Sequence, residues 1–177
     1  MNIPHITTLR TALETAYING ATASCLTNRP QIISNNHKEG KKVLSSVEDE
    51  FLACNQFQIS VAFITMSGIT PLLQTLKELE KKNMKKLNEL QNITLKMYDV
   101  EAAKEGFHTK GYIFKKEEIY RIIIGSSNIT SAALTYNREW NTKIVSTEDG
   151  EMAREIVQEF DSLWNSKYAL GFDTLYE

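Results

Sequence analysis

The sequence predicts an α/β domain with a mixed central β-sheet that is covered by helices on both faces. In the first half of the chain, apolar runs typical of strands alternate with amphipathic helical segments. In the second half, strand-like runs follow one another across short turns, as the strands of hairpins do. A chain of 177 residues can bury about 70% of its unfolded surface as one domain. We therefore expect residues 1–177 to form a single domain with a core at about 28–165.

The first half of the chain is expected to alternate helices with strands. Asn35 and Asn36 offer an N-cap for the second helix, and Ser67 can cap the third, in which Pro71 is tolerated only within the first turn. The second strand is a nearly continuous apolar and β-branched run, which indicates a central strand buried on both sides. The expected elements are a helix at 8–17, a loop at 21–30, a strand at 31–33, a helix at 39–53, a strand at 57–64 and a helix at 67–82.

The second half of the chain is expected to contain more strands. Lys116, Glu117 and Glu118 separate two strand-like runs and predict the turn of a hairpin. Asp149 and Gly150 open the last helix. The expected elements are strands at 92–98, 109–115, 119–125 and 140–146, a loop at 99–106 and a helix at about 151–165.

Each amphipathic helix is expected to turn its apolar side chains toward the sheet. Lys77, Glu78 and the charged run 80–82 are interpreted as a solvated surface. The expected inward-facing residues are Val43, Leu44, Val47, Phe51 and Leu52 in one helix, Leu72, Leu73, Leu76 and Leu79 in the next, and Met152, Ile156, Val157, Phe160 and Trp164 in the last.

Composition narrows the class of protein. A hydrophobic content of 42% is ordinary for a globular protein, and no apolar stretch approaches a membrane span. The segment 1–5 lacks signal-peptide features, and Cys25 and Cys54 do not form a disulfide framework, so we expect a cytoplasmic protein without a membrane partner. Because the net charge is −2, a polyanion would have to be held by a local basic patch.

The chemically informative residues lie between 107 and 140. His108 and Lys110 begin a strand-like run, and alternation along a strand places both side chains on one face. The next run ends in the turn 125–128, Gly-Ser-Ser-Asn, and Glu139 precedes a third run. A nucleophile or base beside a cation, near a turn rich in hydrogen-bond donors, is the arrangement that a phosphate ester requires.

This stretch resembles the phospholipase D superfamily of HKD type, whose signature is H-x-K-x(4)-D followed by G-S-x-N. His108, Lys110 and the turn 125–128 match the signature, and Glu139 stands where nuclease-type members carry an acidic residue. Lys115 stands at the position of the signature Asp, which is generally a structural residue.

The wider chain also resembles the phospholipase D-like nuclease module at the N-terminus of some bacterial helicase-type proteins. Segments 28–31, 59–63 and 127–130 carry this closer likeness. That group usually has a further strand and loop after the helix ending near Lys82, whereas here only residues 84–90 intervene. The resemblance implies a module of a helicase or restriction-type protein.

The resemblance also implies roles for the site residues. His108 would attack phosphorus to form a phosphohistidine, while Lys110 and Asn128 would hold the non-bridging oxygens. Glu139 would accept a proton from an imidazole nitrogen, and Ser126 or Ser127 would add a hydroxyl donor to the substrate. The alternatives are a structural His108, a surface ion pair of Glu139 with Arg138 or Lys143, and a Ser126 that only shapes the turn.

No cofactor or metal site is expected. His5, His37 and His108 lie apart in the sequence, and neither a Cys-x-x-Cys pair nor a phosphate-binding G-x(4)-G-K-[ST] loop is present. We therefore expect a metal-independent phosphodiesterase, with DNA as the leading substrate. A non-catalytic nucleic-acid-binding module and a lipid-hydrolysing phospholipase D are the alternatives.

The single H-x-K triplet predicts a homodimer. The mechanism of the family requires two histidines on opposite sides of one phosphorus atom, and neither His5 nor His37 belongs to a second triplet. Two copies related by a two-fold axis would place both His108 side chains around one phosphate, with the imidazole nitrogens roughly 6 to 7 Å apart.

Overall fold

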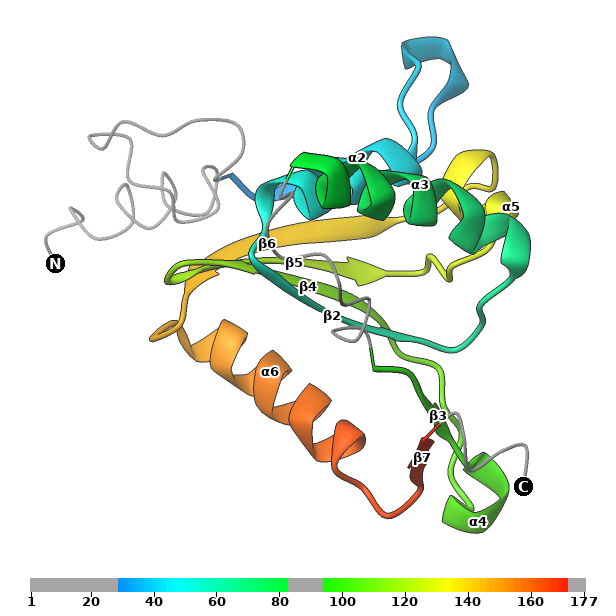
Figure 1. Ribbon diagram of the computed structural model, residues 1–177, viewed down its shortest axis with the longest axis vertical. Coiled ribbons are helices and arrows are strands. Elements are labelled where there is room, and N and C mark those ends of the chain that lie inside the picture. Colours follow the sequence, from blue (N-terminus) through cyan, green and yellow to red (C-terminus); the bar gives the residue numbers. More distant parts are fainter. Residues whose placement is uncertain (1–28, 83–93, 172–177) are drawn as a thin grey trace, which may run out of the picture.

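The computed structural model describes residues 29–82 and 94–171. The helix expected at 8–17, most of the loop at 21–30, Cys25 and the start of the strand expected at 92–98 lie outside the described residues. A central sheet has α2, α3 and α5 on one face and α6 on the other, so the predicted α/β architecture with helices on both faces is confirmed (Figure 1). No helix in the described ranges is long and apolar enough to cross a membrane.

The central sheet has the strand order β1-β6-β5-β4-β2 among the described residues. All its pairings are antiparallel, and one isolated parallel bridge joins Ile64 to Ile129 beyond the strand ends. The predicted hairpin is confirmed, with Glu117 at a positive φ of 54° in its turn. The strands of this sheet are β1 (Gln31–Ile33), β2 (Gln56–Val61), β4 (Lys110–Lys116), β5 (Ile119–Gly125) and β6 (Asn141–Thr147).

The larger hydrophobic core lies between the sheet and three helices. These helices are α2 (Val43–Ala53), α3 (Met66–Lys82) and α5 (Ser131–Thr135). Phe51 of α2 contacts Phe114 of β4 and Phe57 of β2 edge-on, with ring centroids 5.2 and 4.8 Å apart. Tyr112 and Ile123 are buried in the same core because they share this face of the sheet.

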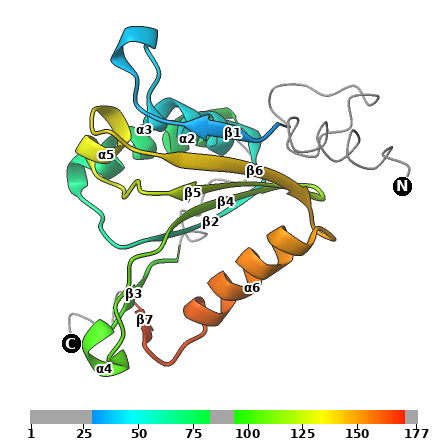
Figure 2. The ribbon, with the colours of Figure 1, turned by 180° about the vertical axis from the view of Figure 1, so that it is seen from behind.

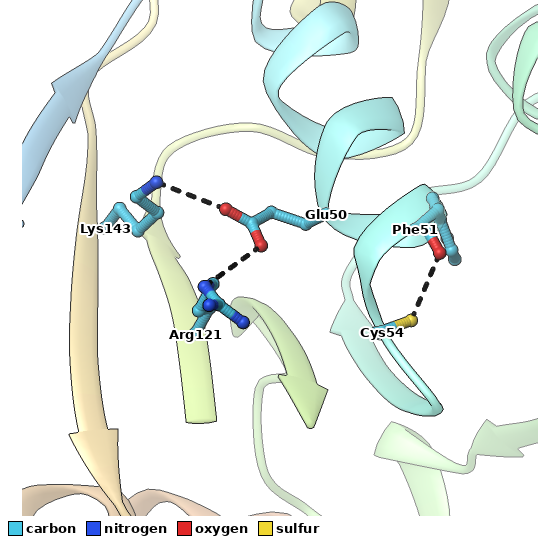
Figure 3. Close-up of polar contacts among 5 residues, drawn as sticks. All are labelled: Glu50, Phe51, Cys54, Arg121 and Lys143. Carbon is cyan, nitrogen blue, oxygen red and sulfur yellow. Dashed lines mark hydrogen bonds and ion pairs between the residues drawn. The ribbon is translucent and has the colours of Figure 1, made fainter. Parts of the chain in front are cut away.

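A buried ionic cluster lies within this layer. Glu50 of α2 is 5% exposed, and its carboxylate contacts Lys143 Nζ at 3.2 Å and Arg121 Nε at 3.8 Å (Figure 3). Both cations project from neighbouring strands, β6 and β5. The carboxylate therefore joins α2 to the sheet while compensating charge that would be costly to bury alone.

The opposite face is covered by α6 (Glu151–Trp164), which begins at Gly150 as predicted. Ile156, Val157 and Phe160 pack against Ile113 and Ile122 of the hairpin. Seen from behind, α6 starts near the end of β6 and leads to β7 (Ala169–Gly171), which pairs with β3 (Lys96–Tyr98) away from the central sheet (Figure 2). The strand expected at 92–98 thus belongs to a separate pair, and the expected loop after it contains the short helix α4 (Val100–Ala103).

The prediction that the strand at 57–64 is central was wrong, because β2 is the edge of the described sheet. Phe57, Ile59 and Val61 alternate onto the larger core, whereas Phe63 and Ile64 lie beyond the strand and are 61% and 45% exposed. The apolar run therefore combines a strand buried on one face with an exposed segment that follows it.

Several expected helix boundaries also differ. Asn36 caps a short 3-10 helix (His37–Glu39), and Gly40 with φ 67° ends it, so α2 begins only at Val43. The hydroxyl of Thr65, not Ser67, accepts a hydrogen bond from Gly68 N at the start of α3. Pro71 lies beyond the first turn of α3.

Three expected inward-facing residues point outward instead. Leu52, Leu73 and Met152 are 44%, 38% and 55% exposed. Leu73 and Met152 lie at the borders of their apolar stripes, whereas Leu52 lies on the side of α2 away from Val43 and Val47. Ala153 takes the buried position in α6. The side chains of Leu76, Leu79 and the charged run 77–82 lie outside the described residues.

Candidate active site

The ends of three neighbouring strands lie side by side at the same end of the central sheet. β4 begins at Lys110, β5 ends at Gly125 and β6 begins at Asn141. Gly111 pairs with Ile124, and Gly125 pairs with Asn141. Neighbouring strands lie about 4.8 Å apart, so the segments 108–110, 126–128 and 139–140 gather at this end. The antiparallel register thereby brings together the residues that the sequence singled out.

Gly125 permits the closest approach in this region. A Cβ atom at this position would lie 2.3 Å from Trp140 O and 2.5 Å from the Cα atom of Asn141. Immediately beyond it, Ser126 N donates to Trp140 O at 3.1 Å, and Trp140 N donates to Ser126 Oγ at 3.1 Å. The glycine therefore allows the serine turn to be bound directly to the segment that carries Glu139.

Glu139 is buried, with 8% of its surface exposed. Its Oε2 atom accepts a short hydrogen bond from the Ser126 hydroxyl. Among the described residues no ion pair joins Glu139 to Arg138 or Lys143, and Lys143 instead binds Glu50. The alternative of a surface ion pair is wrong, because this carboxylate lies inside the site.

The two serines of the turn differ. Ser126 is exposed, but its hydroxyl donates to Glu139 and accepts from Trp140 N, so it orients the carboxylate. Ser127 is completely buried, and the amide of Asn141 binds both its N–H and its hydroxyl, at 3.2 and 2.9 Å. The expectation that Ser127 binds substrate was wrong, because its polar groups are engaged inside the protein. The hydroxyl of Ser126 contacts Glu139 and the main chain of Trp140.

Tyr112 binds the turn 125–128 from the hydrophobic core. Its hydroxyl donates to Ser127 O at 3.0 Å. Burial and, to a lesser extent, the nearby Glu139 carboxylate raise the pKa of the Tyr112 phenol well above its usual range. The phenol therefore remains a neutral donor that holds the turn in place.

Asn128 is oriented by the main chain of the segment after β2. Phe63 N donates to Asn128 Oδ1 at 3.1 Å. Since a backbone N–H can face only the amide oxygen, the amide NH₂ points elsewhere and retains two donors. The adjacent bonds from Ile129 N to Phe63 O and from Thr65 N to Ile129 O, at 3.1 and 2.9 Å, hold the two segments together. Asn128 is thus ready to donate to an anionic oxygen.

His108 and Lys110 form the open part of the site. His108 is exposed, and Lys110, at the first position of β4, is half-buried and donates to His108 O at 2.7 Å. The Thr109 hydroxyl bonds to that of Ser60 on β2, which agrees with the expected alternation of faces. No hydrogen bond joins the His108 ring to Glu139 within residues 29–82 and 94–171. Catalytic hydrogen bonds are often made only when substrate is bound.

The only other described histidine, His37, lies in the 3-10 helix and is exposed. In the part of the chain that the structure describes, no cluster of three or more His, Cys, Asp or Glu residues is arranged to hold a metal ion.

Comparison with known proteins decides the family. Residues 15–164 match the family model described as the PLD-like domain of cardiolipin synthase. The chain belongs to the PLD-like domain family. No curated protein matches the chain.

Two solved structures have a similar fold. NucT from Helicobacter pylori has 14% sequence identity and a TM-score of 0.53, and the match covers 81% of this chain and 99% of that one. Nuc from Salmonella typhimurium, a phospholipase D family member, has 17% identity, the same TM-score and the same coverage. At these identities the likeness concerns the fold. It agrees with the central sheet and helices of this PLD-like domain.

Sequence reasoning missed four residues that build this PLD-like site. Tyr112 and Asn141 support the turn, Phe63 orients Asn128 through its main chain, and Trp140 binds Ser126. Asn141 could have been noticed as a polar residue on the inward side of a strand. The main-chain contacts carry no signal in the sequence, because any residue supplies an N–H or C=O group.

Proposed function

We propose that this protein is a metal-independent phosphodiesterase that hydrolyses nucleic acid, with DNA as the leading substrate, and that it acts through a phosphohistidine on His108. The observation that carries the proposal is that His108, Lys110 and Asn128, whose amide oxygen is bound by Phe63 N, belong to segments that lie at the same end of the central sheet. Lys110 supplies a cation and Asn128 a hydrogen-bond donor for phosphate oxygens, and His108 is a nucleophile near neutral pH.

The proposed reaction gives each of these groups a role. A ring nitrogen of His108 attacks phosphorus, the bond to the leaving oxygen breaks, and an acidic imidazolium supplies the proton to that oxygen. Lys110 and Asn128 stabilise the charge on the non-bridging oxygens. Glu139 holds an imidazolium by accepting its N–H and compensating its charge. The second imidazole, which has given its proton to the leaving oxygen, then acts as the base that activates water, and this water cleaves the phosphohistidine.

The second imidazole, we propose, comes from a second copy of the chain, so that the active unit is a homodimer with a composite site. Phe63 and Met66 support this assembly, because they are 61% and 73% exposed directly beside the segment that orients Asn128. Exposed apolar side chains around a polar site are typical of surfaces that pair. The two-fold arrangement would also double the positive charge facing a polyanion.

Nucleic acid is proposed over lipid on the sequence likeness of segments 28–31, 59–63 and 127–130 to helicase-linked modules, which also makes a helicase or restriction-type protein the expected setting. The family description names cardiolipin synthase, so a lipid phosphodiester is the competing substrate. A non-catalytic nucleic-acid-binding module is the further alternative.

One set of assays separates these functions. The protein is incubated with plasmid, single-stranded oligonucleotide and phosphatidylcholine vesicles, each with and without excess EDTA. We expect the protein to cleave nucleic acid at a rate that EDTA does not reduce. His108→Ala should abolish this cleavage, whereas the control His37→Ala, which removes an exposed histidine elsewhere, should not. Loss in EDTA with recovery in Mg²⁺ contradicts the metal-free mechanism. Faster vesicle hydrolysis supports the lipid function, and binding without cleavage supports the non-catalytic one.

Mixed dimers test the composite site. Wild type and His108→Ala are co-refolded at several ratios, so that the copies assort at random. If each site needs both His108 residues, an equal mixture retains about a quarter of the activity of the undiluted wild type, whereas independent monomers retain about half. Linear dependence on the wild-type fraction would exclude the composite site.

A further inference from the structure

A basic loop leaves the sheet at the end that carries the candidate site. β1 ends at Ile33, which pairs with Asn141 at the start of β6, and the loop 34–42 follows. The loop doubles back on itself, because Asn36 N donates to Lys41 O at 2.8 Å and Lys41 N donates to Asn36 O at 3.0 Å. It extends beyond α2 and α5, on the face of the sheet opposite α6 (Figures 1 and 2). The loop is therefore a defined projection of the fold.

Asn35 anchors this loop to the segment that leads into β6. Its Nδ2 atom donates to Asn137 O at 2.8 Å, and its Oδ1 atom accepts from Val43 N at 2.9 Å. Arg138 directly follows the first of these partners, and Lys42 directly precedes the second. One side-chain amide therefore brings the main chain at two cations close together.

The cations lie near the candidate site and on the same face of the sheet as Lys110. Lys110 precedes Tyr112 by two residues in β4, and Tyr112 is buried in the core beneath α2, α3 and α5, so both side chains share that face. Arg138 directly precedes Glu139. Three strand spacings separate β1 from β4, which places these strands about 14 Å apart. The loop and the site can therefore contact one extended ligand.

Three cations of this surface have no acidic partner in the described structure. Lys38, Lys42 and Arg138 are exposed, and none of them forms an ion pair within residues 29–82 and 94–171. Glu39 in the same loop pairs with Lys41 at 2.6 Å. On the opposite face, α6 carries four acidic residues and one arginine. Although the net charge is −2, a polyanion is therefore attracted to the side of the loop.

We propose that Lys38, Lys42 and Arg138 bind backbone phosphates of a nucleic acid that extends outward from the candidate site. The proposal rests on the proposed phosphodiesterase function. Duplex DNA carries one charge per about 1.7 Å, so a single substrate offers phosphates both to the site and to this surface. Contacts to phosphates carry no sequence information, so binding here should depend on salt and not on base sequence.

The composition of the loop favours nucleic acid over a membrane. A membrane-binding surface combines basic residues with apolar side chains that enter the lipid. Residues 36–42 read Asn-His-Lys-Glu-Gly-Lys-Lys and contain no apolar side chain. Clusters that bind anionic lipid by charge alone carry about four to eight basic residues, more than the three unpaired cations of this surface. A phosphate backbone requires only exposed cations.

Binding of a short fluorescein-labelled DNA duplex to His108→Ala, which should not cleave it, tests the surface by fluorescence anisotropy. The test variant adds Lys38→Gln, Lys42→Gln and Arg138→Gln, and the matched control adds Lys116→Gln, Arg154→Gln and Lys167→Gln. All six side chains are exposed, and the control residues lie at the β4–β5 turn, on α6 and after α6. In about 0.1 M salt the test variant should bind about tenfold more weakly, and the slope of log K against log salt should fall by about 2 to 3. An unchanged slope, or an equal loss in the control, overturns the proposal.

Cleavage separates this proposal from the proposed function. With His108 intact, the three substitutions of the test variant should lower kcat/KM for the duplex about tenfold in about 0.1 M salt. They should leave the hydrolysis of bis(4-nitrophenyl) phosphate unchanged, because this ester is too small to reach the surface. If the wild type cleaves neither substrate, the proposed function fails, while the anisotropy assay still decides the surface. Equal losses on both substrates contradict a surface outside the site. Loss of binding to phosphatidylglycerol vesicles with duplex binding retained would assign the surface to a membrane and overturn the proposal.

Discussion

Two glutamates are buried among the residues that the structure describes, and their surroundings differ. Glu50 is 5% exposed and lies between two cations, Lys143 and Arg121. Glu139 is 8% exposed, and its contact in the described structure is the neutral hydroxyl of Ser126. A buried carboxylate is costly unless a positive charge or several donors compensate it. Glu50 has this compensation, whereas none of the described cations pairs with Glu139.

The contrast agrees with a structural role for Glu50 and with the catalytic role proposed for Glu139. An ion cluster that is complete within the fold contributes to holding α2 against the sheet and needs no ligand. A carboxylate held by one hydroxyl, at the edge where His108 lies, suits an imidazolium that forms only during the reaction. Five predictions test or sharpen this contrast.

The largest effect is expected from Glu139→Gln. The amide keeps an acceptor for the Ser126 hydroxyl but cannot compensate an imidazolium, so kcat should fall about 10³- to 10⁴-fold. The free energy of unfolding should change little. Steady-state kinetics and urea unfolding of the same preparation measure both. Full activity with reduced stability would assign Glu139 to structure.

Glu50→Gln should do the reverse. It leaves two buried cations without their carboxylate, which should lower the free energy of unfolding by about 3 to 5 kcal/mol. The kcat of the folded fraction should stay near that of wild type, because the cluster lies outside the strand ends that carry the site. Urea unfolding with kinetics at low temperature checks both quantities, and unchanged stability would show that the cluster holds nothing together.

Ser126→Ala should have an intermediate effect. It removes the hydroxyl that bonds Glu139 and Trp140 N, so the carboxylate loses its fixed orientation. We expect kcat to fall about tenfold, which corresponds to the loss of one partly buried hydrogen bond of about 1.4 kcal/mol. Ser126→Thr keeps a hydroxyl and should retain more activity. Equal activity in Ser126→Ala and wild type would restore the interpretation that Ser126 only shapes the turn.

The smallest effect is expected at Cys54, one helical turn after Glu50, whose thiol donates to Phe51 O (Figure 3). Burial and, to a lesser extent, the Glu50 charge raise the pKa of the Cys54 thiol from 9.0 to about 11. In a Cys25→Ser background, alkylation by iodoacetamide should therefore rise with a midpoint near pH 11, and Glu50→Gln should move that midpoint down. An unchanged midpoint would mean that the Glu50 charge does not reach the thiol.

The same shift affects stability. The raised pKa favours the folded state fully below pH 9, and this contribution is lost as the pH rises through about 11. Unfolding at pH 8 and pH 11, with and without Cys54→Ala, measures it.

The sequence by itself determined the α/β architecture with helices on both faces and the residues of the candidate site. The spacing of apolar residues and the turn residues predicted the hairpin at 110–125 and the last helix. Such spacing is informative because it decides which face of an element each side chain occupies. His108, Lys110, the turn 125–128 and Glu139 were recognisable because their residue types carry the chemistry. The strand at 57–64 was misplaced as central, because an apolar run alone does not tell whether a neighbour lies on one side or two.

Only the tertiary structure decided how these residues are used. Ser126 and Ser127 belong to one turn, but the structure buries Ser127 and exposes Ser126. Only Ser127 is bound by Asn141 and Tyr112. The tertiary structure paired Lys143 with Glu50 from a distant helix, leaving Glu139 for the site. It also placed Trp140 and Ile32 at one hollow, although they lie far apart in the sequence. Such contacts follow from strand register and helix packing, which join distant segments and leave no local pattern in the chain.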